Sequence, residues 1–245
     1  RRLEGPAVVH HLVRVAAGLE SRMVGETHIQ GQVVQAARRA ESSGSSGPVL
    51  RSLFATAARA GRRARRETPL GRMATCFVTA AVERLAQLDL ERANVVILGS
   101  GVIAHELTTA LRARGAGSVT IVTRHPRAWS AHPGIERVAV VSPGELSMLL
   151  PAADALVGAT SSSRALVGST DIAPRSRPLL VVDLGVPPNV DPDVARIAGV
   201  CRCGLEHFEG PRHAALVLAE AEAIVAGEAE RCVARLRRTR RRVVA

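Results

Sequence analysis

Small residues in the middle of the chain have the spacing of a turn that binds a dinucleotide. Gly99, Gly101 and Ala104 form a G-x-G-x-x-A pattern between an apolar run that ends at Leu98 and a stretch with helical spacing. Gly99 permits a tight turn, Gly101 lets the backbone approach a pyrophosphate, and Ala104 allows the helix to pack closely. Unpaired N–H groups at the helix start would hold the phosphates. The predicted cofactor-binding residues here are Gly99, Ser100, Gly101, Val102, Ile103 and Ala104.

The residues after the next predicted strand indicate which dinucleotide is bound. Enzymes that use NAD commonly place Asp or Glu there, where the carboxylate accepts hydrogen bonds from the ribose hydroxyls. This chain has Thr123, Arg124 and His125 instead. A guanidinium at this position suits the 2′-phosphate of NADP. We therefore predict NADPH as the cofactor, with Thr123 and Arg124 among its contacts. An ordinary surface arginine remains the alternative.

Histidine and cysteine are the other candidates for chemistry. His11 follows His10 in a stretch with helical spacing. An imidazole titrates near neutral pH and can move a proton, although a helical histidine is more often structural. The cysteines are too few and too irregularly spaced for a disulfide framework or a zinc site, so we expect reduced thiols and no metal. They are Cys76, Cys201, Cys203 and Cys232.

Short apolar runs alternate with helical stretches in the second part of the chain. The βαβ unit around the Gly-rich turn has Ile103, Leu107 and Leu111 on one face of its helix. Alternation of strand and helix favours a parallel sheet covered on both faces. The predicted fold class is α/β, a Rossmann-type doubly wound parallel sheet. We predict strands at residues 95–98, 119–122, 138–141, 155–157 and 179–182.

Helical patterns precede and follow the predicted sheet. Apolar residues recur at helical spacing from residue 12 to about 40, and further helices are expected at about 49–66 and 74–88. From about residue 211 a long helix carries an apolar stripe, which must be covered by its own domain or by a second subunit. We divide the chain into a helical domain (1–88), a Rossmann domain (89–207) and a C-terminal helical segment (208–245).

Composition limits the classes of partner. The net charge is +11 and all 33 basic residues are Arg, which fits contact with RNA phosphates and equally fits a GC-rich coding bias. With no Tyr, one Trp and three Phe, an aromatic platform for stacking bases is not expected. No apolar run approaches the ~18 residues of a spanning helix. We expect a cytoplasmic protein and, because the sequence begins with Arg1, a fragment.

Several segments together resemble one known family. Residues 11–21 (HLVRVAAGLES) and 24–33 (VGETHIQGQV) are similar to the glutamyl-tRNA reductase pattern H-L-x-R-V-A-x-G-L-D-S-x-x-x-G-E-x-Q-I-L-G-Q-V. Residues 62–68 (RRARRET) resemble K-R-V-R-x-E-T, and residues 183–192 (DLGVPPNVDP) resemble D-I-A-V-P-R-D-I-D-P. The likeness covers essentially the whole chain in the family's order. It implies half of a catalytic domain, an NADPH domain and the start of a dimerisation helix.

The resemblance implies an NADPH-dependent enzyme that reduces glutamyl-tRNA(Glu) to glutamate-1-semialdehyde, the first committed step of tetrapyrrole (porphyrin and haem) biosynthesis. In that family a Cys thiolate captures the glutamyl group as a thioester, which accepts hydride more readily than an oxygen ester. His11 matches the catalytic histidine, and Glu26 suits the substrate's ammonium group by its charge. A homodimer through the C-terminal helix and a complex with glutamate-1-semialdehyde aminomutase are also implied. The matched pocket positions are Ser21, Glu26, Thr27, His28 and Gln32.

The sequence departs from the family pattern at several positions. The family nucleophile belongs to an S-T-C-N-R motif upstream of the H-L-x-R-V-A segment, and this chain contains no such motif, so we expect the chain alone to be inactive. His28 stands where the family has Gln, Gln30 where it has Leu, and Pro188-Asn189 where it has Arg-Asp. Cys76 stands where Ser is usual, and we interpret it as a small helical cysteine rather than a relocated nucleophile.

Two alternatives stay open from the sequence. A catalytically silent relative would keep the NADPH site or a protein partner without the reaction. A small-molecule NADP-dependent dehydrogenase of the shikimate-dehydrogenase type would share the cofactor domain, but it would need a substrate-binding Lys–Asp pair, and the chain has no Lys. An S-T-C-N-R motif encoded upstream of Arg1 would favour the enzyme over the silent relative.

Overall fold

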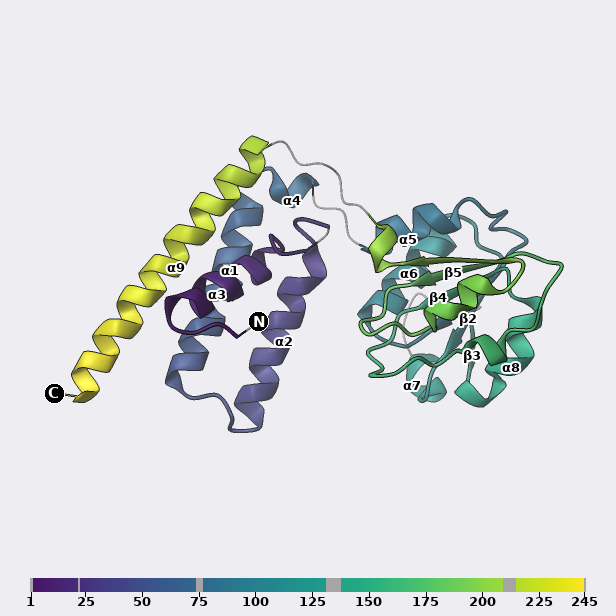
Figure 1. Cartoon of the computed structure of the whole chain (residues 1–245), viewed down its shortest axis with the longest axis horizontal. Helices are drawn as coiled ribbons and strands as arrows, with labels where there is room; N and C mark the ends of the chain where they lie inside the picture. The colour runs from purple at the N-terminus through teal and green to yellow at the C-terminus, as the bar shows by residue number, and fades with distance from the viewer. Residues whose placement is uncertain (1, 22, 74–76, 131–137, 209–214, 245) are drawn as a thin grey trace. The chain divides into compact units, whose positions relative to one another are not determined.

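The chain divides into two compact units (Figure 1). The helical unit comprises residues 1–76 together with 209–245, and the Rossmann unit comprises residues 77–208. Among the residues that the structure describes, no helix is long and apolar enough to cross a membrane. The computed structural model describes residues 2–21, 23–73, 77–130, 138–208 and 215–244.

Proline and glycine mark three helix ends in the helical unit. Proline begins α1 and α3, because its missing N–H needs no partner in the first turn of a helix. α1 ends before Gly18, which adopts a φ of 80° and donates its N–H to the Val15 carbonyl oxygen at 2.9 Å. The turn that follows separates α1 from α2 within the helical stretch predicted from residue 12 to 40. The helix bounds are α1 (Pro6–Ala17), α2 (Thr27–Ser42), α3 (Pro48–Glu67), α4 (Leu70–Met73) and α9 (Ala215–Val244).

α1 and α3 pack closely because small residues face one another. Gly61 of α3 lies so near α1 that a Cβ there would come within 2.6 Å of the Ala16 carbonyl oxygen. One turn later, Arg65 donates Nη2 to the carbonyl oxygens of Ala16 (3.3 Å) and Glu26 (3.1 Å). The last carbonyls of a helix have no intrahelical partner. Arg65 therefore completes the end of α1 and joins it to the start of α2.

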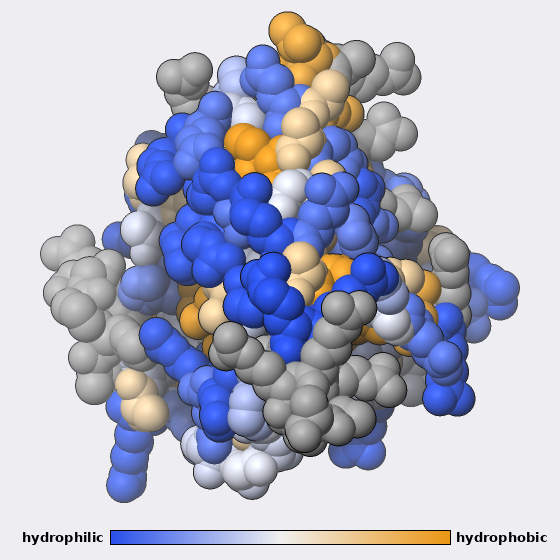
Figure 2. Space-filling view, turned by 90° about the vertical axis from the view of Figure 1, so that its left-hand side faces the viewer, coloured by the Kyte–Doolittle hydropathy of each residue, from blue (hydrophilic) through white to orange (hydrophobic). Residues whose placement is uncertain are grey.

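α9 packs along α1 and α3 within the helical unit (Figure 1). The sequence left open whether the apolar stripe of α9 is covered by its own domain or by a second subunit. In the structure, the stripe is buried within the helical unit. Figure 2 shows the side of the molecule that carries α9, where the coloured residues are mainly hydrophilic and the hydrophobic ones form separate areas. The buried apolar residues of α9 are Val217, Ala221, Val225, Ala229 and Cys232.

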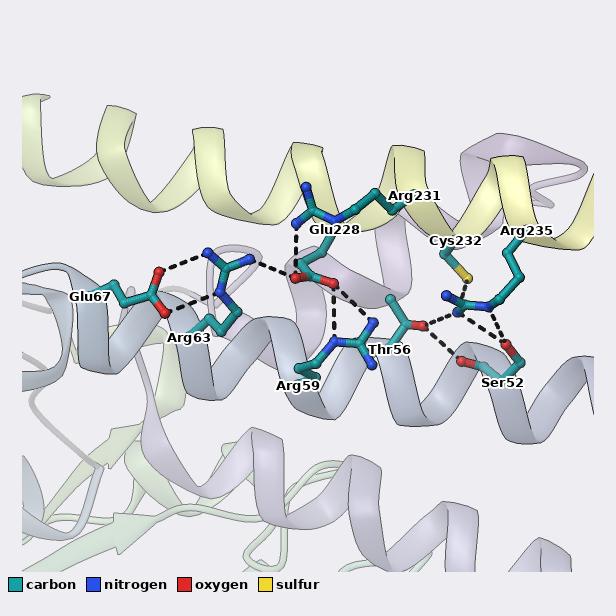
Figure 3. A network of polar contacts seen from close by, with 9 residues as sticks. All are labelled: Ser52, Thr56, Arg59, Arg63, Glu67, Glu228, Arg231, Cys232 and Arg235. Carbon is teal, nitrogen blue, oxygen red and sulfur yellow. Dashed lines mark hydrogen bonds and ion pairs between the residues drawn. The ribbon is translucent and has the colours of Figure 1, made fainter.

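A buried carboxylate also joins α9 to α3 (Figure 3). Glu228 is 4% exposed and accepts hydrogen bonds from Arg59 Nη2 (3.0 Å) and Arg63 Nη1 (2.6 Å), both on α3. Arg231, on α9 itself, donates at 2.9 Å. Burial raises the pKa of the Glu228 carboxyl, but the three guanidiniums outweigh burial and lower the pKa to about 2. Glu228 thus stays charged at neutral pH and makes charge-assisted hydrogen bonds between the helices.

Further polar contacts join α3 and α9 on either side of Glu228. Arg235 of α9 donates Nη2 to the hydroxyl oxygens of Ser52 (3.1 Å) and Thr56 (2.8 Å) on α3 (Figure 3). At the other end, Arg63 also donates to Glu67 at 2.8 Å, and this contact is the main cause of a Glu67 pKa of about 2. Arg63 is therefore shared by a carboxylate on its own helix and one on α9.

The described residues of the Rossmann unit form a six-stranded parallel sheet in the order β3-β2-β1-β4-β5-β6. The strands are β1 (Asn94–Leu98), β2 (Ser118–Val122), β3 (Ala139–Val141), β4 (Ala155–Gly158), β5 (Leu179–Asp183) and β6 (Val200–Gly204). The helices are α5 (Phe77–Leu85), α6 (Val102–Ala113), α7 (Pro126–Ser130) and α8 (Leu146–Leu149). The 3₁₀ helices are η1 (Pro143–Glu145), η2 (Leu150–Ala152), η3 (Ser169–Asp171), η4 (Pro192–Arg196) and η5 (Leu205–His207). The predicted Rossmann-type fold class is confirmed.

Some details differ from the sequence-based expectations. β6 was not predicted, because VCRCG contains one β-branched residue and lies at the sheet edge. α5 packs on α6 and β5 in the Rossmann unit, although the sequence placed it in a helical domain that extends to residue 88. The C-terminal segment 208–245 was expected as a part of its own, and α9 instead belongs to the helical unit. Residues 74–76, including Cys76, lie outside the described residues.

Loss of the Glu228 charge is expected to loosen α9. The variant Glu228→Gln should lose about 2–3 kcal/mol of stability in the helical unit near pH 7. The reason is that Arg59 and Arg63 keep their positive charges but lose the carboxylate that they share. The folded pKa of about 2 lies below the ordinary 4.5, so this stabilisation is complete above about pH 5 and is lost as the pH falls towards 2. Urea unfolding, followed by far-UV circular dichroism at several pH values, measures this free energy of unfolding for the wild type and the variant.

Two controls belong to this experiment. Glu230→Gln removes the same charge from an exposed position of α9 and should leave stability nearly unchanged. Trp129, the single tryptophan, is buried in the Rossmann unit, so its fluorescence reports the unfolding of that unit separately. If Glu228→Gln and Glu230→Gln unfold alike at pH 7, the buried carboxylate does not stabilise the packing of α9.

Candidate functional site

Neighbouring strands place the Gly-rich turn in the middle of one edge of the sheet. The parallel register pairs Leu98 of β1 with Val122 of β2 and with Gly158 of β4. Gly99 donates its N–H to the Val122 carbonyl oxygen and Ala159 donates to that of Leu98, both at 2.9 Å. The strand order reverses between β1 and β4. Ligands of open α/β sheets bind at such a reversal, beyond the carboxyl ends of the strands.

Gly99 and Gly101 are glycine for different physical reasons. Gly99 adopts a φ of 119°, and a Cβ there would lie 2.5 Å from the Ala159 carbonyl oxygen. Gly101 has an ordinary φ of −84°, and no atom lies within 4 Å of the place its Cβ would take. The fold itself therefore requires Gly99, whereas Gly101 leaves open space at the N-terminus of α6. That space suits a phosphate group. Ala104 is fully buried, as close packing of α6 requires.

The end of β2 is tied to the Gly-rich turn by a side-chain hydrogen bond. Thr123 is 5% exposed, and its Oγ1 donates to the Ser100 Oγ at 2.9 Å. The side chain of the next residue, Arg124, is exposed to solvent. Val102 is 66% exposed at the start of α6, and Ile103 is partly buried. The hydrogen bond between Thr123 and Ser100 therefore joins the residues predicted from the two strand ends, and the exposed Arg124 directly follows Thr123 in the chain.

The last residue of β5, Asp183, and the loops after β4 and β5 reach the same edge and were not assigned to the site from the sequence. Asp183 is 1% exposed and accepts backbone N–H groups from Gly185 (3.0 Å), Asn189 (3.2 Å) and Val190 (2.9 Å). Asn189 Oδ1 accepts the N–H of Thr160, after β4, at 2.9 Å. These bonds tie the two loops together beside the open turn. The run D-L-G-V-P at the end of a predicted strand was the available signal.

The predicted catalytic histidine lies on α1 in the helical unit. The His11 side chain is 51% exposed, and its Nδ1 lies 3.9 Å from Oε1 of Glu20 in the turn after α1. Arg14, almost one turn further along α1, donates Nε to the same Glu20 oxygen at 2.6 Å. The imidazole is thus reachable from solvent and has a carboxylate beside one of its ring nitrogens.

Glu26 and His28 form a pair at the start of α2. Glu26 is 1% exposed, and its Oε1 accepts the His28 backbone N–H at 2.9 Å and lies 2.7 Å from His28 Nδ1. The carboxylate caps α2, whose first N–H groups have no intrahelical partner. Burial lowers the pKa of the nearby Arg65, and the charge of Glu26 opposes that effect. Any contact of Glu26 with a substrate ammonium would share the carboxylate with this cap.

The other predicted pocket residues have more exposed surroundings. Ser21, in the turn after α1, accepts the Met23 N–H at 3.2 Å. Thr27 and Gln32 lie on α2 and have exposed side chains. Among the predicted pocket residues, Glu26 and His28 contact each other.

The described cysteines do not form disulfides. Cys203 on β6 is buried, and burial raises the pKa of its thiol, with Arg84 opposing the shift, so less of it is thiolate at neutral pH. Cys201 is exposed on the same strand, and Cys232 is buried in α9. Within the described parts of the chain, no group of three or more His, Cys, Asp or Glu residues is arranged to hold a metal.

The two units match different family models. Residues 1–68 match the N-terminal domain of glutamyl-tRNA(Glu) reductase, and residues 80–209 match shikimate / quinate 5-dehydrogenase. The glutamyl-tRNA reductase of Exiguobacterium sp. is 33% identical over 214 residues, which covers 84% of this chain and 48% of the relative. That of Thermus thermophilus is 36% identical over 195 residues, or 78% of this chain and 50% of the relative. This chain belongs to the glutamyl-tRNA reductase family.

The extent of these matches bears on the alternatives. The chain spans about half the length of the curated glutamyl-tRNA reductases it matches. A solved glutamyl-tRNA reductase from Methanopyrus kandleri aligns with 98% of this chain and 63% of its own, with 27% identity and a TM-score of 0.47. The shikimate-type model accounts for the Rossmann unit and leaves the helical unit unexplained. Together, the dehydrogenase match and the open edge of the sheet support a nicotinamide cofactor.

Replacing each glycine of the turn by alanine should affect different properties: Gly101→Ala the affinity for dinucleotide, and Gly99→Ala the stability of the fold. Gly101→Ala should leave the free energy of unfolding within about 0.5 kcal/mol, because the methyl group meets no protein atom. The same methyl group should weaken binding of NADPH and of NADH by about tenfold or more, because it occupies the path of the pyrophosphate. Gly99→Ala should destabilise the Rossmann unit by about 2–4 kcal/mol through backbone strain and overlap.

Calorimetric titration and Trp129 fluorescence in urea separate these effects. Unchanged dinucleotide affinity in a folded Gly101→Ala variant would show that the cofactor does not approach this turn.

Proposed function

We propose that this chain is the part of a glutamyl-tRNA reductase that carries the catalytic histidine and the NADPH-binding domain. The complete protein would reduce glutamyl-tRNA(Glu) to glutamate-1-semialdehyde for tetrapyrrole biosynthesis. The observation that carries the proposal is the pairing, in one chain, of the glutamyl-tRNA reductase helical segment with a Rossmann unit whose Gly-rich edge is open. Either part alone would leave the reaction undetermined.

The proposed cofactor is NADPH, and bound at this edge it would supply hydride to the carbonyl carbon of the substrate. The N–H groups at the start of α6, next to Gly101, would bind the pyrophosphate. Thr123 would hold Ser100 in place through their hydrogen bond. Arg124 would pair with the 2′-phosphate, since its side chain is exposed at the end of β2.

In the helical unit, we assign proton transfer to His11 and substrate contacts to the start of α2. A half-exposed imidazole beside a carboxylate can exchange a proton with an oxygen of the reacting ester. Glu26 and His28 would bind the glutamyl group as a pair, because they already share a hydrogen bond. The remaining proposed pocket residues are Ser21, Thr27 and Gln32.

The proposal includes the partners of the complete protein. Glutamyl-tRNA(Glu) is the proposed substrate, and the cytoplasm is the proposed compartment. We also propose a homodimer through the C-terminal helix and a complex with glutamate-1-semialdehyde aminomutase, which would receive the reactive aldehyde. Residues 1–88, 89–207 and 208–245 would correspond to the catalytic, NADPH and dimerisation parts of the enzyme, although α5 packs in the Rossmann unit and α9 in the helical unit.

A turnover assay of the complete protein with glutamyl-tRNA and NADPH tests the reaction. We expect formation of glutamate-1-semialdehyde, and a fall in kcat of about 100-fold or more in His11→Ala, the range of general acid–base catalysis. His10→Ala is the matched control, because it removes a neighbouring imidazole of α1 and should retain most of the activity. Full activity in His11→Ala would remove His11 from the mechanism. No turnover in the wild type would favour the catalytically silent relative.

Cofactor choice is tested at Arg124. Arg124→Gln should weaken NADPH binding about 10- to 100-fold, because a charge-assisted contact with the 2′-phosphate is lost, and should leave NADH binding nearly unchanged. Arg114→Gln, at the opposite end of α6, is the control for loss of an exposed positive charge from the same unit. Equal losses for NADPH and NADH, or none for either, would contradict recognition of the 2′-phosphate by Arg124.

A further inference from the structure

We propose that Arg14 and Glu222 are positioning residues for His11, so that the C-terminal helix α9 helps to set the histidine of the proposed reaction. This inference rests on the proposed function for its catalytic meaning. The contacts that carry it lie wholly within the helical unit. They run from Glu222 on α9 through Arg14 on α1 to Glu20, and from Glu20 to His11.

Arg14 is the central member, because it binds two carboxylates at once. Its Nε donates to Glu20 Oε1 at 2.6 Å, and its Nη1 donates to Glu222 Oε2. The side chains of Arg14, Glu20 and Glu222 are all partly buried, with exposed fractions of 34%, 39% and 39%. The hydrogen bond to Glu20 is the main cause of a raised pKa of Arg14, burial opposes it, and Glu222 adds to it. A planar guanidinium can hold two anions in fixed directions.

Glu222 is fixed in place by the packing of its own helix. Its neighbours Ala221 and Val225 are buried against the core that α9 shares with α1. Val13, next to Arg14 on α1, is buried in the same core. The backbones on both sides of the Arg14–Glu222 pair are therefore anchored by apolar contacts. The pair joins residues that are 208 positions apart in the sequence.

Glu20 transmits this arrangement to the imidazole. Its Oε1 lies 3.9 Å from His11 Nδ1, which is an electrostatic contact rather than a hydrogen bond. A carboxylate beside Nδ1 favours the tautomer with its proton on that nitrogen, so Nε2 remains the proton acceptor. Arg14 holds the Glu20 oxygen at this place and sets how much of its charge reaches His11. Without the Glu222 carboxylate, the Arg14 guanidinium is drawn towards Glu20. It then neutralises more of the Glu20 charge, which weakens the field of that carboxylate at the His11 imidazole.

The test uses Glu222→Gln in the complete protein, with Glu220→Gln as the matched control. Glu220 is exposed on the same helix, so the control makes the same change of charge without the contact to Arg14. We expect Glu222→Gln to lower kcat about fivefold with KM unchanged, the size of a typical coupling between contacting residues. NMR signals of the ¹³C-labelled His11 ring, assigned by their loss in His11→Gln, should shift in Glu222→Gln and stay in place in Glu220→Gln.

A double-mutant cycle separates positioning from general destabilisation. In a His11→Ala background, Glu222→Gln should have no further effect on kcat, because its effect acts through the missing imidazole. Arg14→Lys should resemble Glu222→Gln, since one ammonium cannot reproduce the fork between two carboxylates. The proposal would be wrong if the His11 signals shift in neither Glu222→Gln nor Arg14→Lys. An equal loss of kcat with and without His11 would also contradict it.

The two proposals fail in different ways. If the complete protein shows no turnover, or if His11→Ala is fully active, the proposed function or the role of His11 is wrong. The NMR comparison of Glu222→Gln with Glu220→Gln still decides whether α9 positions the imidazole, because it needs no turnover.

Discussion

The ion pairs and apolar contacts that hold α9 on α1 and α3 are the constraint on which the helical unit depends. α1 has 12 residues, and isolated helices of that length are marginal in water. Its buried face is completed by α3 and α9, which come from later parts of the chain. The residues proposed for chemistry stand on α1 and at the start of α2. Their geometry therefore depends on a helix that is far away in sequence.

Charge gives this packing its register. A stripe of Ala and Val residues can slide along another helix with little change in buried area, whereas a carboxylate must meet its guanidinium. Glu222 meets Arg14 of α1, and Glu228 meets Arg59 and Arg63 of α3. These contacts come from residues six positions apart on α9, less than two helical turns, and together they fix both its position and its rotation. The many arginines of the chain thus have a structural use besides any contact with RNA.

The local patterns of the sequence were sufficient for five of the six described strands of the Rossmann unit and for its Gly-rich turn. A buried strand, a turn of glycines and an amphipathic helix are encoded within about twenty neighbouring residues, and the structure has them in the predicted places. β6 was not predicted because an edge strand needs fewer apolar residues, and because Cys201 and Arg202 interrupt its β-branched pattern. The network around Asp183 and Asn189 was not predicted for a different reason. It joins loops after two separate strands, which only the tertiary fold brings together.

Burial is the property that the sequence concealed in the helical unit, and it decides how substitutions there should be understood. Gln30 stands where the family has Leu, yet its Nε2 donates to the Ala58 carbonyl oxygen at 3.0 Å and its Oε1 accepts from Arg65. The polar side chain is therefore satisfied inside the unit, and it supports the arginine that holds the end of α1. Glu26, which the family resemblance placed in the substrate pocket, also caps α2. Because His28 shares that carboxylate, a change at His28 alters the helix cap and the proposed pocket together.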